Sequence, residues 1–202
     1  MYSVLSYGAY GTGKTTFGVS AFWDIMANKP VEGRSGRWLL IGRESNDALG
    51  VPEEMIKRFP APEKDPIKFV KDFSAYLKIL AMAGAKGQGP TDIVVDGWTE
   101  LNSVFIWAYD ESVDAKNQFE SWREWKREFL GAIQKLHPDV LKANIFGTAR
   151  IGQLRKGTTT KTGEKIGEDP DYMADFKYYP AMEGWARYNL GHYFNFVVYH
   201  ED

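Results

Sequence analysis

Residues 6–17 read SYGAYGTGKTTF and form a glycine-rich turn between an apolar segment and a helix-like segment. Residues 8–15 match the pattern G-x-x-x-x-G-K-[ST] in full, which is typical of loops that bind a nucleotide phosphate. The glycines let successive backbone N–H groups turn inward around the phosphate, at the positively polarised start of the following helix. The residues expected to bind the phosphate are Gly8, Ala9, Tyr10, Gly11, Thr12, Gly13, Lys14, Thr15 and Thr16.

Two side chains of this turn carry the chemistry that such loops need. Lys14 is expected to reach the β- and γ-phosphates and to assist catalysis, and the Thr15 hydroxyl is expected to bind Mg²⁺. Tyr10 is bulky, but it is compatible with the loop because only the flanking glycines need unusual backbone angles. The turn therefore predicts ATP and Mg²⁺ as cofactors.

Short apolar segments alternate with helix-like segments along the chain. The expected strands are residues 4–7, 38–42, 93–95, 144–147 and 192–199, and the expected helices are residues 15–26, 69–82 and 119–136. Residues 45–65 are rich in proline and charge and are expected to form loop or short helix. The alternation predicts an α/β fold with a mostly parallel central sheet and helices on both faces.

The expected strand at residues 93–95 ends in Asp96, which predicts a second part of the nucleotide site. An aspartate at this place holds Mg²⁺ in phosphate-loop enzymes.

Hydrolysis also needs a carboxylate that orients or deprotonates the attacking water. In one large group of these ATPases that carboxylate directly follows the metal aspartate, but here the position is Gly97. Two candidates remain open, Glu44 and Glu100, and we favour Glu44 because it follows a strand expected beside the loop.

The order of these features resembles the RecA/RadA class of ATPases over nearly the whole chain. The phosphate loop, the strand before Glu44, the strand ending in Asp96, a long helix and NIFGTARIGQLRKGTTTKTG (residues 144–163) follow one another. More narrowly, the chain is similar to the small RecA-like proteins of phages that are linked to single-strand annealing and recombination. The resemblance implies a single RecA-like P-loop ATPase domain over residues 1–202 that forms a homo-oligomer.

The resemblance also implies roles for single residues. It makes Glu44 the catalytic base and places Thr148 where a polar sensor contacts the γ-phosphate or the attacking water. RecA itself usually has an amide side chain at this place, so Thr148 is a departure from the family pattern. Arg150 is expected to stabilise the transition state in a neighbouring subunit, with a surface ion-pair arginine as the alternative.

Residues 152–175 form a polar stretch that is longer than most connections in a compact domain and is expected to be mobile. The corresponding loop of the RecA family contacts single-stranded DNA. The resemblance therefore implies that this stretch binds DNA phosphates through Arg155, Lys156, Lys161 and Lys165. A solvated insertion that only carries charge is the alternative.

Composition limits the classes of function. The 202 residues include no cysteine, which excludes disulfides, zinc–thiolate sites and cysteine nucleophiles. Neither a membrane-spanning apolar run nor a signal-peptide layout is evident, so we expect a cytoplasmic protein without a membrane partner. The net charge of −2 disfavours a broad nucleic-acid-binding face, so binding to DNA requires a local patch or an oligomer.

Three functions remain open from the sequence. The first is a RecA-like ATPase that acts on single-stranded DNA in recombination or annealing. The second is a motor or switch ATPase of another phosphate-loop branch, for example in phage DNA packaging or helicase loading. The third is a nucleotide-dependent assembly module with little turnover. Gly97 disfavours the helicase-like branches that need an acid at its position.

Overall fold

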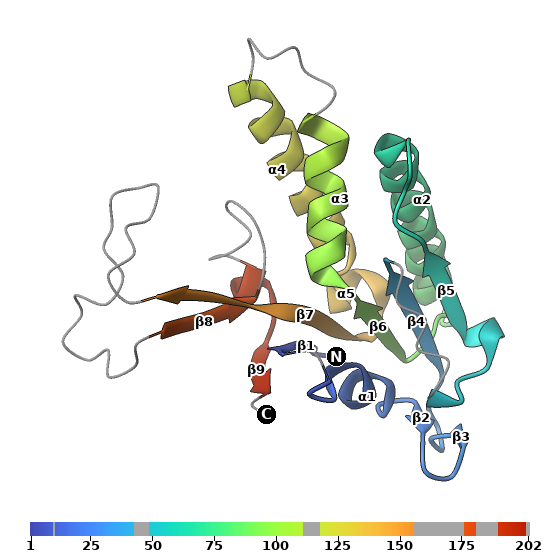
Figure 1. Cartoon of the computed structure of the whole chain (residues 1–202). Coiled ribbons are helices and arrows are strands. Elements are labelled where there is room, and N and C mark those ends of the chain that lie inside the picture. The colour runs from blue at the N-terminus through green and yellow to red at the C-terminus, as the bar shows by residue number, and fades with distance from the viewer. Residues whose placement is uncertain (10, 43–48, 111–117, 156–175, 181–189, 201–202) are drawn as a thin grey trace.

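The computed structural model describes residues 1–9, 11–42, 49–110, 118–155, 176–180 and 190–200 (Figure 1). The elements are β1 (Ser3–Gly8), α1 (Lys14–Val19), β2 (Trp23–Asp24), β3 (Lys29–Pro30), β4 (Gly36–Ile41), η2 (Glu53–Met55), β5 (Ile56–Phe59), α2 (Pro66–Ala85), β6 (Asp92–Asp96), α3 (Trp98–Asp110), α4 (Gln118–Lys135), α5 (Pro138–Leu141), β7 (Asn144–Arg155), β8 (Phe176–Pro180), η4 (Leu190–Tyr193) and β9 (Phe196–His200).

The core of the described chain is a parallel sheet with the strand order β5-β4-β6-β7-β1-β9. The predicted α/β class with a mostly parallel sheet is confirmed. Because neighbouring strands run in the same direction, their carboxyl ends meet at one edge of the sheet. Strand β7 lies between β1 and β6, so Thr148 is in register with both Ser6 and Asp96. This order places the phosphate loop, Asp96 and Thr148 at the same edge.

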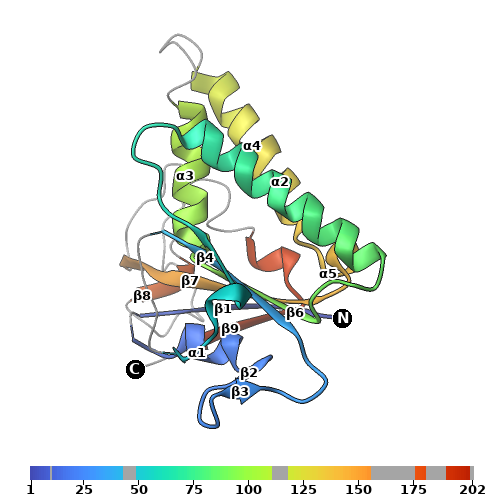
Figure 2. The same ribbon diagram turned by 90° about the vertical axis from the view of Figure 1, so that its right-hand side faces the viewer.

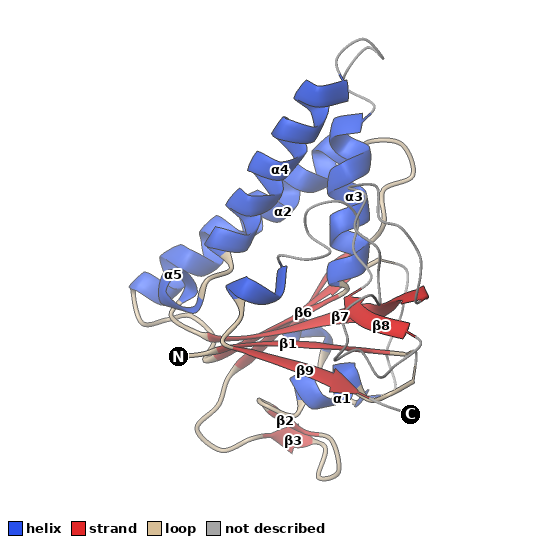
Figure 3. Cartoon of the chain, turned by 90° about the vertical axis from the view of Figure 1, so that its left-hand side faces the viewer, coloured by secondary structure: helices blue, strands red, loops and turns tan. Residues whose placement is uncertain are grey.

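Helices cover both faces of the sheet, as predicted. Figures 2 and 3 show α2, α3, α4 and α5 on one face, and α1 with the β2-β3 hairpin on the other. The strands alternate accordingly: Leu39 and Val95 belong to the larger apolar cluster, whereas Leu40 and Val94 belong to the smaller cluster under α1. The period-two pattern of each strand therefore builds two separate hydrophobic layers.

The longest predicted helices form close to their expected bounds. Helix α2 begins after Asp65, whose carboxylate accepts a hydrogen bond from the Lys68 N–H, and Pro66 occupies its first position. Its buried side includes Phe69, Phe73 and Leu77 at helical spacing.

Several local predictions differ from the structure. The helix predicted over residues 15–26 ends at Val19, because Phe22 and Trp23 pack against the sheet through a turn and strand β2. Helix α3 was not predicted, although its buried side chains have helical spacing. Edge strand β5 was also missed; its residues are Ile-Lys-Arg-Phe, of which only Phe59 is buried.

The polar stretch predicted to begin at residue 152 begins later in the structure. Strand β7 continues to Arg155, and its residues 151–155 pair with β8 in antiparallel orientation. Figure 1 shows β7 and β8 reaching beyond the rest of the sheet. Residues 156–175 lie outside the described chain. The last predicted strand also starts later, because residues 190–193 form η4 and β9 begins at Phe196.

Two glycine-to-alanine variants test the packing. A Cβ at Gly36, the first residue of β4, would overlap the buried ring of Phe22, whereas a Cβ at Gly131 on α4 would meet open space. We expect Gly36→Ala to lower the free energy of unfolding by about 1–3 kcal/mol and Gly131→Ala to raise it by about 0.5–1 kcal/mol. Urea denaturation measures both, and equal stability of the two variants would contradict this packing.

Candidate functional site

The phosphate loop joins β1 to α1 and depends on three glycines. Gly11 and Gly13 have φ angles of +84° and +80°, in the left-handed region that glycine adopts without strain. Gly8 has a different requirement, because a Cβ there would lie 2.6 Å from the carbonyl oxygen of His200. The glycines of the motif are therefore required by backbone conformation at two positions and by close packing at the third.

Lys14 lies across this loop. Its ammonium group donates hydrogen bonds to the Ala9 carbonyl and, at 3.3 Å, to the Thr12 hydroxyl. The Thr12 hydroxyl itself donates to the Ala9 carbonyl at 3.0 Å. These contacts hold a positive charge beside the loop backbone, where a phosphate is expected. Thr16 is exposed at the start of α1, and Tyr10 lies outside the described residues.

The carboxylate of Asp96 is the centre of the site. It accepts hydrogen bonds from the Thr15 hydroxyl at 2.9 Å, from the Trp38 indole N–H at 3.3 Å and from the Thr148 hydroxyl. Thr148 in turn accepts a hydrogen bond of 3.1 Å from the N–H of Gly97. The structure therefore brings together Thr15, Asp96 and Thr148, which the sequence placed in one site.

This donor set fits a magnesium ion that is shared with phosphates. Mg²⁺ in nucleotide sites usually takes one or two protein oxygens and completes its coordination with water and phosphate oxygens. Thr15 and Asp96 supply a hydroxyl and a carboxylate next to the loop. Among the described residues, no group of three or more His, Cys, Asp or Glu side chains is placed to hold a metal ion by itself.

Glu100 lies on the first turn of α3, which begins two residues after Asp96. A Cβ added to Gly97 would be 3.2 Å from its Oε2 atom, and a Cβ added to Gly42 would be 3.1 Å from its Cγ atom. Both glycines have positive φ angles at the carboxyl ends of β6 and β4. Glu100 therefore occupies the same sheet edge as Asp96 and Thr148. Glu44, the favoured base, lies outside the described residues. The strand before it, β4, was expected beside the loop strand, but β6 and β7 lie between β4 and β1.

Arg150 forms an ion pair with Glu100 of its own chain, with Nη2 and Oε1 2.5 Å apart. Its backbone N–H also donates to the Thr99 hydroxyl at 3.0 Å. The side chain of Arg150 is 60% exposed, so the pair lies at the rim of the site. This geometry matches the ion-pair alternative for Arg150, and its role in a neighbouring subunit stays a prediction.

The residues expected to bind DNA are only partly placed. Arg155 is the last residue of β7, so it stands at the end of the arm that β7 forms with β8. Lys156, Lys161 and Lys165 lie outside the described residues. Their role in DNA binding therefore stays a prediction.

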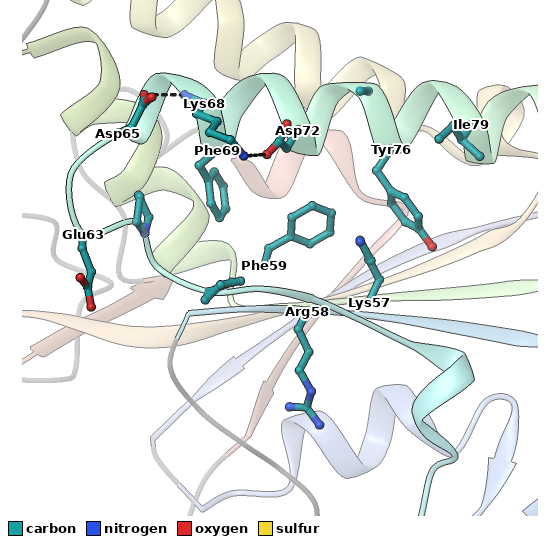
Figure 4. A pocket seen from close by; sticks show the side chains of 13 residues that line it. Lys57, Arg58, Phe59, Glu63, Asp65, Lys68, Phe69, Asp72, Tyr76 and Ile79 are labelled. Carbon is teal, nitrogen blue, oxygen red and sulfur yellow. Dashed lines mark hydrogen bonds and ion pairs between the residues drawn. The ribbon is translucent and has the colours of Figure 1, made fainter.

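A groove lies at the far edge of the sheet, between β5 and α2, with a volume of about 580 Å³. Figure 4 shows Phe59, Phe69 and Tyr76 facing this groove, while Arg58 points away from α2. The ammonium of Lys57 lies over the Phe59 and Tyr76 rings, at 5.7 and 5.6 Å from their centroids. Burial raises the pKa of the Tyr76 phenol, and the Arg37 charge opposes this shift. Strands β4, β6 and β7 separate the groove from the phosphate-loop strand β1.

Comparisons with known proteins do not identify a family for this chain, so any functional assignment depends on its motifs and geometry. No family model matches the chain, and no curated protein matches its sequence significantly. Within the described chain, no helix is long and apolar enough to cross a membrane. The similarity to RecA and RadA thus stays a prediction.

Substitution of Thr148 tests the hydrogen-bonded cluster. Thr148→Val keeps the shape and the strand preference of the side chain but leaves the Gly97 N–H without its acceptor and removes a donor from Asp96. We expect the free energy of unfolding to fall by about 1–3 kcal/mol, whereas Thr148→Ser retains most of the stability. Chemical denaturation compares the two variants. A valine variant as stable as the serine variant would exclude a stabilising role for the hydroxyl.

Proposed function

We propose that this chain is a RecA-like ATPase that binds Mg²⁺-ATP at the phosphate loop, hydrolyses it and acts on single-stranded DNA. The observation that supports the nucleotide site best is the hydrogen-bonded cluster of Thr15, Asp96 and Thr148 beside the glycine loop. A glycine turn that matched the motif only by chance would not be expected to lie against a buried carboxylate and a threonine from two other strands.

The loop and the cluster have distinct tasks in this proposal. The loop backbone and Lys14 bind the phosphates, and Thr15 and Asp96 hold the metal. The Thr15 hydroxyl donates a hydrogen bond to Asp96, so the lone pairs of its oxygen can face a cation. A bound Mg²⁺ supplies neutralisation of the charge on the phosphates.

The water-orienting carboxylate is either Glu44 or Glu100. Glu44 is proposed from the resemblance to RecA. Glu100 is supported by its place beside Gly97, directly after Asp96 in the chain, and by Arg150, which fixes the orientation of its carboxylate. Only a carboxylate within hydrogen-bond reach of the attacking water can accept its proton. Substituting Glu44 and Glu100 one at a time therefore distinguishes the two candidates.

Strand β7 is the part of the structure that supports a link to DNA. It carries Thr148 between β1 and β6 and continues to Arg155, beyond the parallel strands and paired with β8. The lysines at positions 156, 161 and 165 follow directly in the sequence. We propose that this basic segment contacts the phosphates of single-stranded DNA, in a homo-oligomer that repeats the segment along the strand.

Three substitutions test the nucleotide chemistry. Lys14→Ala removes a charge that stabilises the phosphates, so we expect the ATPase rate to fall about 100-fold or more. Loss of the water-orienting carboxylate has a similar cost, and only one of Glu44→Gln and Glu100→Gln is expected to show it while still binding ATP. Steady-state phosphate release and ATP binding measure these effects. Full activity of Lys14→Ala would refute the site, and a loss confined to Glu100→Gln would exclude Glu44 as the base.

Stimulation by DNA tests the proposed partner. ATPase activity is measured without DNA, with single-stranded DNA and with duplex DNA, and we expect single-stranded DNA to stimulate it most. Replacing Arg155, Lys156, Lys161 and Lys165 by glutamine removes phosphate contacts and should weaken binding with a smaller salt dependence. Stimulation by duplex DNA favours a packaging-type motor instead, and no stimulation favours an assembly module.

A further inference from the structure

A strip of aromatic side chains runs along the α1 face of the sheet and ends at the phosphate loop. Phe17 and Phe196 are 40% and 59% exposed, although both are large apolar side chains. The rings of Phe196, Tyr2, Phe146, Phe17 and His200 form a chain of edge-to-face contacts with centroid distances of 5.7–6.4 Å. The strip therefore exposes an aromatic surface beside a site that we propose binds a nucleotide.

Phe17 and His200 form the end of the strip nearest the loop. Phe17 directly follows Lys14, Thr15 and Thr16, and its N–H donates to the Gly13 carbonyl at 2.8 Å. His200 is in register with Gly8, the first glycine of the loop, on the neighbouring strand. The two side chains therefore border the loop from two different elements, α1 and β9.

The His200 ring is held in place by two contacts. Its Nε2 atom lies 2.7 Å from the hydroxyl of Ser6, which is buried on β1. Its ring also lies 5.7 Å from the Phe17 ring, at an interplanar angle of 66°. Because Nε2 contacts Ser6, a hydrogen bond from this ring to a ligand would use the other nitrogen, Nδ1.

We propose that Phe17 and His200 form the surface that binds the base of the nucleotide. This inference rests on the proposed nucleotide site and adds the residues that recognise the base. A base is joined to the α-phosphate through a single ribose, so it lies within one sugar's reach of the loop that Phe17 and His200 border. Stacking on Phe17 suits any base, because every base has a π-face, and a purine gains most because of its larger ring.

The exposure of Phe17, together with its place directly after the loop, distinguishes this role from packing alone. A ring that served only to fill the layer under β1 would be covered, as Phe22 and Phe146 are. Phe17 instead makes edge contacts with Phe146 and His200 while two-fifths of its surface stays open to solvent.

Binding of ATP and of inorganic tripolyphosphate, measured by isothermal titration calorimetry with Mg²⁺, tests the proposal. Tripolyphosphate offers the phosphates without a base. We expect Phe17→Leu, which keeps an apolar side chain, to weaken ATP binding about tenfold and to leave tripolyphosphate binding unchanged. His200→Ala is expected to act in the same direction. Phe196→Ala is the control, because this more exposed ring is in the same strip but in register with Val4, at the end of β1 away from the loop, and it should leave both affinities unchanged.

The outcomes separate this inference from the proposed function. Suppose that the wild-type chain binds both ATP and tripolyphosphate. If Phe17→Leu then weakens the binding of both compounds equally, or of neither compound, the base-binding role is wrong and the phosphate site stands. An effect of Phe196→Ala as large as that of Phe17→Leu would equally exclude a local base site. If the wild-type chain binds neither compound, the proposed nucleotide site fails, and the base-binding surface fails with it.

Discussion

The buried carboxylate of Asp96 is the constraint on which the site depends. A buried carboxylate is costly unless hydrogen bonds replace its water, and here the donors come from Thr15 on α1, Trp38 on β4 and Thr148 on β7. Each donor can reach Asp96 only if its own element is in place. The carboxylate of Asp96 therefore links α1, β4 and β7 to β6, and it does so without any bound ligand.

The parallel sheet explains why these groups converge. Strands that run in one direction end at one edge, and the placement of β7 between β1 and β6 puts Thr148 within reach of both. Gly97 then turns with a φ of +112°, which directs its N–H to Thr148 and leaves room for Glu100. Gly97 thus places no side chain directly after Asp96, and the carboxylate of Glu100 from helix α3 lies close to it instead.

Sequence patterns predicted the parts of the fold that depend on local residue order. The glycine motif and the apolar strand before Asp96 are contiguous signals, and both have the expected positions. Helix α1 was predicted too long because Phe22 continues the helical spacing of apolar residues, although its ring packs against Gly36 on a distant strand. The ion pair between Arg150 and Glu100 depends on the pairing of β7 with β6, which local patterns do not encode.

Strand β9 illustrates how a distant segment becomes part of a local site. It is the last strand of the sheet and pairs with β1, yet its end supplies His200, whose backbone excludes any side chain at Gly8. Ser6 and Asn195 add hydrogen bonds between the two strands at either end. The conformation of the phosphate loop is therefore set from two sides, by α1 after the loop and by β9 beside it.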